Sequence, residues 1–347
     1  MGTLRTIKLA ALGTAESLGA FRLTARTRWR TERLLILCYH GVSLQDEHEC
    51  SEEHVSVDHL QHRFEILRRE RCAVLPLDEA VERLFASDLP PRSVALTFDD
   101  GLYDFKARAY PLLQRFGYPA TVYVTSYYCR FPRPVFDVAA WYLLWKGRGR
   151  PLDTGPLTSE GGQVRVPDHR AGRTSLFRSI RAHLNARRLN GPQKDLLLRR
   201  LCEGLGFDWG AFLASRMYQL MTPEELRSLD AGLVDLQLHT HRHRTPRDQP
   251  LFLREVDDNI AELESVGRAR SELRHFCYPS GDVDPMFFPW LRSRGVVTAT
   301  TCDPQLASGR SDPLRLPRVI DTMETTDVEF RSWLSGLSGF VPQRGGA

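Results

Sequence analysis

The sequence predicts an α/β fold, a distorted parallel (β/α) barrel of about seven or eight strands with a mainly helical insertion. Three observations support this prediction. Short apolar runs alternate with helical patterns, as they do in consecutive parallel βα units. The sheet lacks the glycine-rich phosphate loop that would favour a doubly wound arrangement. Four polar clusters follow expected strands, at the edge where barrel enzymes carry their chemistry.

Length and composition indicate an ordinary folded protein. The chain has 347 residues, of which 42% are hydrophobic and 26% charged, so it can form one large domain with an insertion, or two domains. These values exclude disordered and collagen-like chains, and no apolar run approaches the roughly 18 residues of a membrane-spanning helix. Seven cysteines without a C-x-x-C pair favour a reducing compartment. Because Glu16 interrupts the apolar N-terminal stretch and no cleavage site follows, we expect a cytoplasmic protein.

The first part of the chain reads as three βα units and a fourth strand. The apolar run 34–38 has the composition of a buried strand, and Leu60, Phe64 and Leu67 then recur at helical spacing. Gly117 is placed to end a later helix. The expected strands are 34–38, 73–75, 94–98 and 120–124, and the expected helices are 57–71, 78–87 and 110–116.

The βα pattern lapses over 130–220 and then resumes. Thr222 is a typical N-cap, with Pro223 at the first helical position and Glu225 at the third, and Gly232 is expected to end that helix. The remaining expected strands are 233–238, 276–278, 296–300 and 316–320, with helices at 251–266 and up to Arg294. The predicted organisation is therefore a basic N-terminal segment (1–32), a barrel (33–330) with a basic insertion (130–220), and a C-terminal tail (331–347).

Four polar clusters fall at strand ends: Tyr-His-Gly-Val at 39–42, Thr-Phe-Asp-Asp-Gly at 97–101, His-Thr-His-Arg-His at 239–243, and Tyr-Pro-Ser-Gly at 278–281. Adjacent carboxylates after an apolar strand are costly to desolvate unless another group compensates them. One carboxylate with two imidazoles leaves an open position on Zn²⁺, as catalytic zinc sites do. The second carboxylate is then free to act as a base.

Each cluster alone also has a purely structural explanation. Asp-Asp-Gly is a common turn or helix cap, the histidine pair can be a solvated loop, and Tyr-Pro-Ser-Gly can be a simple turn. His40 alone can be a half-buried histidine that is satisfied locally. The occurrence of all four clusters on one predicted face favours a functional site.

The motifs at 97–101, 239–243 and 278–281 resemble those of the polysaccharide deacetylase family (carbohydrate esterase family 4, NodB homology domain). The sequences at 39–42 and 316–319 resemble the branch of that family that begins with a tyrosine–histidine strand end. The resemblance covers about 33–129 and 221–321, so the segment between them is an addition.

The resemblance implies a role for each matching residue. Asp100, His239 and His243 would bind a divalent metal, with zinc the first choice and cobalt or nickel accepted by the same ligands. Asp99 would be the general base for the attacking water. Thr240 would brace the histidine loop, and Tyr278 would line the substrate groove and supply a backbone amide to the oxyanion. Tyr278 and Ser280 are thus the expected substrate contacts from the 278–281 motif.

Two departures from the family pattern matter. The arginine that many members place just before the Tyr-Pro motif is absent. We expect Arg318 to tether Asp99 from another strand or to contact substrate, and Arg242 and Arg244 are alternatives for the tether. No histidine follows His275, so the usual general acid is missing and His40 becomes the candidate for that role or for a substrate contact. His241 is expected to point away from the metal.

The resemblance implies a metal-dependent hydrolase of carbon–nitrogen bonds, which removes an N-acyl group from an amino sugar. N-acetyl is the first choice, and the substrate would be a surface polysaccharide or its lipid-linked precursor. The alternatives are an inactive carbohydrate-binding barrel, and a deformylase or O-deacetylase acting on a lipid-linked sugar. Nucleic-acid binding is disfavoured because the basic segments lack interleaved aromatic residues.

Charge is unevenly distributed along the chain. Against a net charge of +4, residues 1–33 carry +5 and residues 130–220 carry +9, so the remainder is acidic. Apolar residues of the N-terminal segment (Leu4, Ile7, Ala11 and Leu18) share one helical face, and 141–145 read Trp-Tyr-Leu-Leu-Trp. Aromatic and basic residues together suit contact with an anionic membrane, here the inner face of the cell membrane. The alternative is that 141–145 form the insertion's own core.

Overall fold

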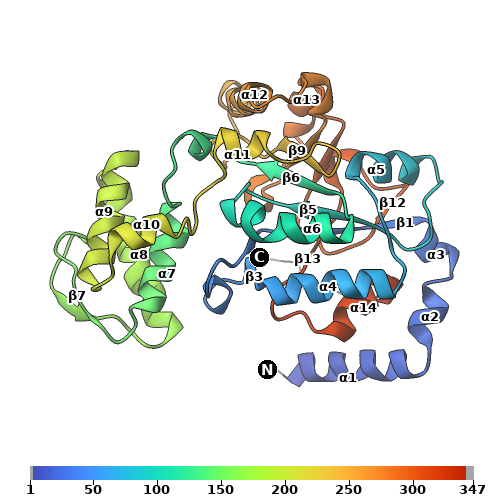
Figure 1. The fold of residues 1–347 in the computed structure, drawn as a ribbon, viewed down its shortest axis with the longest axis horizontal. Coiled ribbons are helices and arrows are strands. Elements are labelled where there is room, and N and C mark those ends of the chain that lie inside the picture. The colour runs from blue at the N-terminus through green and yellow to red at the C-terminus, as the bar shows by residue number, and fades with distance from the viewer. Residues whose placement is uncertain (1–2, 341–347) are drawn as a thin grey trace.

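A curled, mainly parallel sheet of nine strands forms the centre of the computed structural model, which describes residues 3–340 (Figure 1). Its order is β11 (Thr298–Thr300), β10 (His275–Cys277), β9 (Val234–Leu238), β6 (Ala120–Val124), β5 (Ser93–Phe98), β1 (Arg33–Tyr39) and β12 (Ala307–Ser308), with β13 (Val319–Ile320) on β1 and β4 (Ala73–Val74) on β5. Of these strands, β12 alone pairs antiparallel.

The barrel closes through the segment that leads into β13. Leu316 bridges Thr300 at the end of β11, and three residues later β13 begins and pairs with β1. Closure by one bridge and one two-residue strand explains why the barrel is distorted. The predicted fold class is confirmed, and each of the eight expected strands has its counterpart; the short antiparallel β12 was not predicted.

Helices cover the sheet where the apolar periodicity predicts them: α4 (Val57–Arg69), α5 (Leu77–Phe85), α6 (Tyr110–Phe116), α12 (Gln249–Ser265) and α13 (Phe287–Arg292). A π-helical turn, η2 (Phe105–Ala109), precedes α6. The capping box at Thr222 is present, but α11 (Pro223–Arg227) ends before the predicted Gly232. It is shorter because a turn follows in which the amides of Leu233 and Val234 donate to the carbonyl of Asp230.

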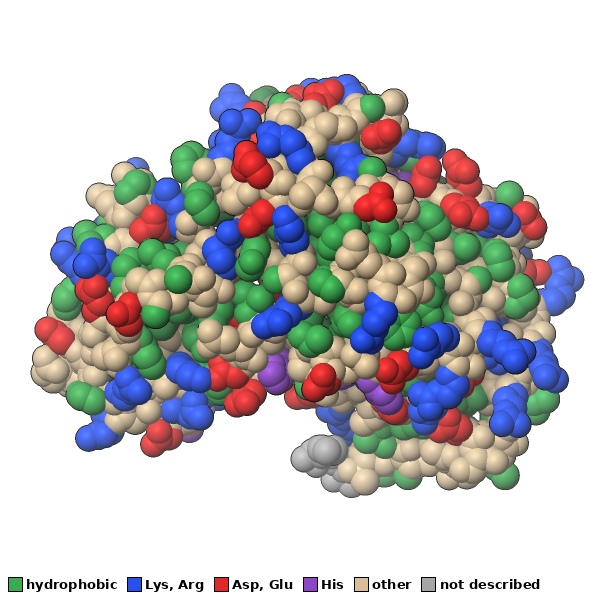
Figure 2. Space-filling view, in the orientation of Figure 1, with side chains coloured by type: hydrophobic (Ala, Val, Ile, Leu, Met, Phe, Trp, Pro, Cys, Tyr) green, Lys and Arg blue, Asp and Glu red, His purple; other side chains and the backbone are tan. Residues whose placement is uncertain are grey.

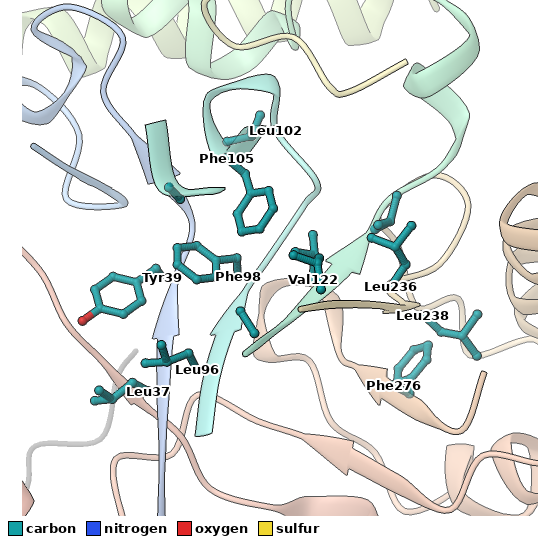
Figure 3. Packing of buried hydrophobic residues seen from close by; sticks show 14 of the residues in the cluster. Leu37, Tyr39, Leu96, Phe98, Leu102, Phe105, Val122, Leu236, Leu238 and Phe276 are labelled. Atoms are coloured by element: carbon teal, nitrogen blue, oxygen red, sulfur yellow. The ribbon is translucent and has the colours of Figure 1, made fainter. Parts of the chain in front are cut away.

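Strand side chains alternate between two environments. On one face, Leu37, Leu96 and Val122 join the large apolar cluster that packs under the helices (Figure 3). Residues of the opposite parity point inside the curl, where β1 contributes apolar side chains and β5, β6 and β9 contribute mostly polar ones. Asp99 and His239 continue this inward register just beyond β5 and β9. The alternation therefore delivers polar groups to one end of the barrel.

The N-terminal segment forms three helices, α1 (Thr3–Ser17), α2 (Ala20–Thr24) and α3 (Arg28–Thr31). Of these, α1 and α2 lie beside α14 (Asp327–Ser335), and α3 packs against β1 (Figure 1). Arg30 is fully buried and its Nε donates to the carbonyl oxygen of Leu334 at 2.7 Å. The predicted boundary of a tail at 331 is wrong, because Thr326 caps a helix that runs through it and buries Trp333 and Leu334. Residues 341–347 and the side chain of Leu4 lie outside the described part of the chain.

The insertion forms a helical lobe beside the barrel (Figure 1). Its elements are α7 (Phe136–Lys146), the hairpin β7 (Pro151–Asp153) and β8 (Gln163–Arg165), α8 (Arg170–Ala186), α9 (Gly191–Gly204) and α10 (Trp209–Ala214). It has an apolar cluster of its own that includes 142–145, and the indole Nε1 of Trp141 donates to the carbonyl of Cys50 at 3.1 Å. The predicted membrane-facing role does not hold for 142–145, because these side chains are buried in the core of the insertion, and Trp141 is half-buried beside them.

Short elements complete the chain: β2 (Gly41–Val42) with β3 (His54–Val55), and the 3-10 turns η1 (Glu47–Glu49), η3 (Tyr127–Arg130), η4 (Arg270–Glu272), η5 (Pro279–Gly281), η6 (Pro313–Arg315) and η7 (Leu337–Phe340). Between residues 3 and 340, none of the helices has both the length and the apolar character that crossing a membrane requires.

Candidate active site

The four polar clusters meet at the carboxyl end of the barrel, where they line a cavity of about 430 Å³. The residues there that the sequence predicted are His40, Asp99, Asp100, His239, His243, Tyr278 and Ser280. Parallel strands end at a common edge, so β1, β5, β9 and β10 each deliver one cluster to the same place. The insertion closes one side of the cavity, and Figure 2 shows the surface hollowed where the insertion meets the barrel.

Left-handed backbone conformations are concentrated at the site. Asp100 has φ 70°, Thr240 has φ 61° and His243 has φ 51°. Each such residue costs on the order of 1–3 kcal/mol and persists only where the surrounding structure holds it. The turn at Asp100 lets its side chain approach the histidines, although simple strand alternation would send adjacent Asp99 and Asp100 to opposite faces.

Asp100, His239 and His243 form a compact set of metal-ligating atoms. The Oδ1 atom of Asp100 lies 3.4 Å from the Nε2 atom of each histidine. The Nδ1–H of His239 donates to the carbonyl of Cys277 at 2.9 Å, which leaves its Nε2 lone pair facing Asp100. One carboxylate and two imidazoles match the donor set of a catalytic zinc site, so these residues fit a divalent metal.

Asp99 is buried and held by an arginine. Its Oδ1 and Oδ2 atoms each accept a hydrogen bond of 2.7 Å from Arg318, one from Nη1 and one from Nη2. Burial alone would raise the pKa of Asp99, but the charge and hydrogen bonds of Arg318 outweigh it and hold the pKa well below its usual range. Asp99 is thus an ionised carboxylate, in position to accept a proton.

Arg318 is fully buried, so the expectation that it contacts substrate is wrong. Its other expected role, to tether the carboxylate of Asp99, is the one that the geometry shows. Its guanidinium reaches Asp99 from the segment before β13, and its Nη2 lies 3.1 Å from the Sγ atom of Cys277. Cys277 stands directly before Tyr278, at the position where the family resemblance predicts an arginine. Arg318, buried in the segment before β13, therefore takes the place of that arginine.

His40 lies at the edge of the cavity with its Nε2 atom 3.8 Å from Oδ2 of Asp99. Its Nδ1 atom is buried and has no hydrogen-bond partner among the described residues. A histidine so close to the carboxylate is placed to exchange a proton in the cavity. His241 faces elsewhere, as expected, with its Nδ1 atom 2.9 Å from the hydroxyl of Ser126.

Tyr278 of the 278–281 motif lines the cavity, where the substrate groove was predicted, but its hydroxyl and its backbone amide both have partners within the protein. Tyr278 is only 1% exposed, and its hydroxyl donates to the carbonyl of Leu314 at 3.0 Å. Its backbone amide already donates to the carbonyl of Thr300 at 3.4 Å, so neither group is free for an oxyanion in this structure. Ser280 is exposed at the cavity, with φ 56°, and remains the candidate substrate contact of this motif.

Two residues that support the site were missed by the sequence analysis. Asn259 on α12 accepts from the amide of His239 at 2.9 Å, and its Nδ2 donates to the carbonyl of Val124. Glu255 is 1% exposed and accepts from Arg244 Nε at 2.7 Å. Their spacing of four residues places two polar side chains on the buried face of α12. That interruption of an apolar face is the signal that could have identified them.

Thiols surround the proposed base, which the sequence analysis also did not predict. The Sγ atoms of Cys277 and Cys38 lie 3.4 Å and 3.6 Å from Oδ2 of Asp99. Their register, the same as that of Asp99, places them inside the curl.

Comparisons with known proteins agree with this fold. Residues 86–133 match the family model for polysaccharide deacetylase, which confirms the resemblance predicted from the motifs. No curated protein sequence matches the chain.

Solved structures match over most of the chain. The Streptococcus pyogenes deacetylase PplD in complex with acetate has a TM-score of 0.55 at 16% identity, over 89% of this chain and 99% of that one. IcaB from Ammonifex degensii has a TM-score of 0.54 at 18% identity, over 87% and 97%. A de-N-acetylase from Aggregatibacter actinomycetemcomitans has a TM-score of 0.53 at 13% identity, over 87% and 99%. At these identities the likeness establishes the fold.

Proposed function

We propose that the chain is a hydrolase of carbon–nitrogen bonds that removes an N-acyl group from an amino sugar with the help of a divalent metal. The match of residues 86–133 to the family model for polysaccharide deacetylase supports this proposal. N-acetyl is the acyl group we propose first, and the PplD structure, which contains acetate, supports it. The substrate we propose is a surface polysaccharide or its lipid-linked precursor. The observation that carries the proposal is the convergence of Asp100, His239 and His243 beside the ionised Asp99.

Asp100, His239 and His243 would hold the metal, zinc first, with cobalt or nickel acceptable to the same ligands. Such an ion, when bound, polarises the acyl carbonyl and makes a nearby water more acidic. Because Nδ1 of His239 is engaged by the carbonyl of Cys277, this ring stays in the orientation that presents Nε2.

Protein side chains carry out the proton transfers of the hydrolysis. Asp99 takes a proton from the water that attacks the acyl carbon, and Arg318 keeps the carboxylate ionised and oriented before that step. His40 delivers a proton to the amine nitrogen as the carbon–nitrogen bond breaks. The products are a free acid and an amino sugar.

Release of the acid tests the function. We expect zinc-loaded protein to liberate acetate from at least one member of a panel of N-acetylated glycans and lipid-linked amino sugars, and a chelator to abolish the release. Formate or O-linked acetate as the main product would instead support the deformylase or O-deacetylase alternative. Glycan binding without release of any acid would support an inactive binding barrel.

We also propose that the protein works in the cytoplasm at the inner face of the membrane, through the outer side of the N-terminal helices. Ile7, Leu18 and Leu23 are 60%, 78% and 69% exposed, and Arg22 and Arg26 are exposed beside them. Apolar side chains flanked by arginines suit the surface of an anionic bilayer. The basic residues of α1 contribute less than expected, because Arg5 and Lys8 pair with Glu324 and Glu329 of the same chain.

Vesicle co-sedimentation tests this contact. We expect binding to anionic vesicles at low salt, weaker binding as salt screens the charges, and a further loss in a variant with Leu18→Ser and Leu23→Ser. The matched control, Leu196→Ser, changes an exposed leucine of the insertion (48% exposed) and should bind like the wild type. Equal binding to neutral and anionic vesicles, or none to either, would contradict the proposal.

A further inference from the structure

A second group of metal-ligating side chains lies beside the proposed base, next to the residues proposed to hold the catalytic metal. Cys38, His40 and Asp99 each offer one ligand atom, and these three atoms lie within 4.8 Å of one another. Cys38 and Asp99 are buried, and His40 is half-buried at the edge of the cavity. The proposed hydrolysis uses Asp99 and His40 but gives the thiol of Cys38 no role.

The strand register explains why these three residues meet. Tyr39 packs in the apolar cluster under the helices (Figure 3), so the alternation along β1 turns Cys38 and His40 to the inside of the curl. On the neighbouring strand β5, Phe98 pairs with Tyr39, and the next residue is Asp99. The amide of Asp99 donates to the carbonyl of Tyr39 at 2.9 Å. The paired backbone of two strands thus holds the group together.

The distances between the ligand atoms suit a tetrahedral ion. Oδ2 of Asp99 lies 3.6 Å from the Sγ atom of Cys38 and 3.8 Å from the Nε2 atom of His40. On a tetrahedral zinc ion with metal–ligand bonds of ~2.1–2.3 Å, the ligand atoms are roughly 3.4–3.6 Å apart. The set is therefore close to the geometry of a metal site, and three protein ligands leave the fourth position to water.

Ligand type and charge decide which ions fit and how tightly. One thiolate, one imidazole and one carboxylate select zinc or cadmium over magnesium and calcium, which prefer oxygen ligands. The guanidinium of Arg318 already donates to both oxygens of Asp99 and opposes a further cation. Burial keeps the pKa of the Cys38 thiol well above its usual value, and this thiol must release its proton to bind an ion. We therefore expect this group to bind more weakly than the catalytic set.

We propose that Cys38, His40 and Asp99 form a second, inhibitory metal site, which takes a thiophilic divalent ion such as zinc or cadmium. The bound ion engages the carboxylate that would accept a proton from water and the imidazole that would deliver one to the amine. Hydrolysis therefore slows when the site fills, so the protein is most active within a window of metal concentration. The inhibition rests on the proposed function, whereas occupancy of the site does not.

Cadmium binding tests occupancy without turnover. An ion bound through Cys38 gives the ultraviolet charge-transfer band of a cadmium thiolate, whereas an ion on the catalytic set has no thiolate ligand. We expect zinc-loaded wild type to develop this band with about one equivalent of cadmium, and Cys38→Ala to lack it. The matched control, Cys202→Ala, removes a buried free thiol from the core of the insertion and should keep the band.

The metal dependence of acid release tests the inhibition. In the wild type we expect the rate to rise with the first equivalent of zinc and then to fall at least ~10-fold from its maximum, because the second ion engages the base. Desalting should remove the weaker ion and restore the maximum rate. Cys38→Ala, compared with its own maximum, should rise without falling, and Cys202→Ala should behave like the wild type. Excess magnesium should not lower the rate.

Retention of the first zinc ion shows that Cys38→Ala is folded, and Cys38→Ser replaces this variant if that ion is lost. The inference is overturned if the band or the fall in rate survives the change at Cys38. A band that is lost in Cys277→Ala instead would place the ion on the neighbouring set of Asp99, His239 and Cys277.

The inference and the proposed function fail separately. A cadmium band that depends on Cys38 upholds the second site even if the wild type releases no acid. Acid release that reaches a plateau in excess zinc, without a band, upholds the function and overturns the second site.

Discussion

Asp99→Asn is expected to lower kcat/KM for the best N-acylated glycan by at least ~100-fold, the usual contribution of a general base. An amide does not take a proton from water at neutral pH, and Asp99 is the carboxylate that Arg318 holds ionised at the cavity. The metal content should stay at that of the wild type, because Asp100, His239 and His243 are unchanged.

Two further variants test whether a loss of activity in Asp99→Asn comes from the loss of the base or from a damaged fold or metal site. Asp99→Asn leaves the buried charge of Arg318 without its partner, so the double variant Asp99→Asn/Arg318→Met, which removes both charges, should also fold, bind metal and remain inactive. His40→Ala should weaken activity without removing metal. Near-normal turnover of Asp99→Asn would place the base elsewhere, and metal loss in His40→Ala would make His40 a ligand.

Arg318→Met should destabilise the fold by about 3–5 kcal/mol, the usual cost of removing one partner of a buried ion pair. Arg318 and Asp99 are both nearly inaccessible to water, so the charge left on Asp99 has no solvent to stabilise it. Activity should fall as well, since the pKa of an untethered, buried carboxyl rises and the base becomes protonated. Urea unfolding of the metal-loaded protein measures the first effect.

Arg315→Met is the matched control. Arg315 pairs with Asp303 at 3.2 Å, but both side chains are more than half exposed, and such pairs contribute at most about 1 kcal/mol. The double variant Asp99→Asn/Arg318→Met should recover part of the stability lost by Arg318→Met. If Arg318→Met unfolds at the same urea concentration as Arg315→Met, the tether does not contribute to stability as the structure indicates.

The sequence predicted the parts of the fold that depend on local periodicity. The apolar runs at 34–38 and 94–98 became central strands, and Ser56, next to the predicted start of α4, caps that helix. What it could not predict depends on contacts between distant segments. The antiparallel β12 is two residues long, and α14 crosses a predicted boundary because its apolar face packs near the N-terminal helices.

In the candidate site, too, the features that depend on local sequence could be predicted and those that depend on contacts between distant segments could not. Asp99, Asp100, His239 and His243 were identified because each stands at the end of a strand, and parallel strands end at one edge. Whether Arg318 tethers or contacts substrate depended on its depth of burial, which its position in the sequence does not reveal. The aromatic run 141–145 was ambiguous for the same reason, since apolar residues on a helix suit a core and a membrane surface equally.

The central claim is that Asp100, His239 and His243 bind the metal on which hydrolysis depends. The most direct test is metal content by mass spectrometry, measured with acid release, for wild type, His239→Ala, His243→Ala and His241→Ala. His241 lies in the same loop but bonds to Ser126, so it is the internal control. We expect about one zinc per chain in the wild type and in His241→Ala, and loss of both metal and activity in the other two. Full metal occupancy in both His239→Ala and His243→Ala would contradict the claim.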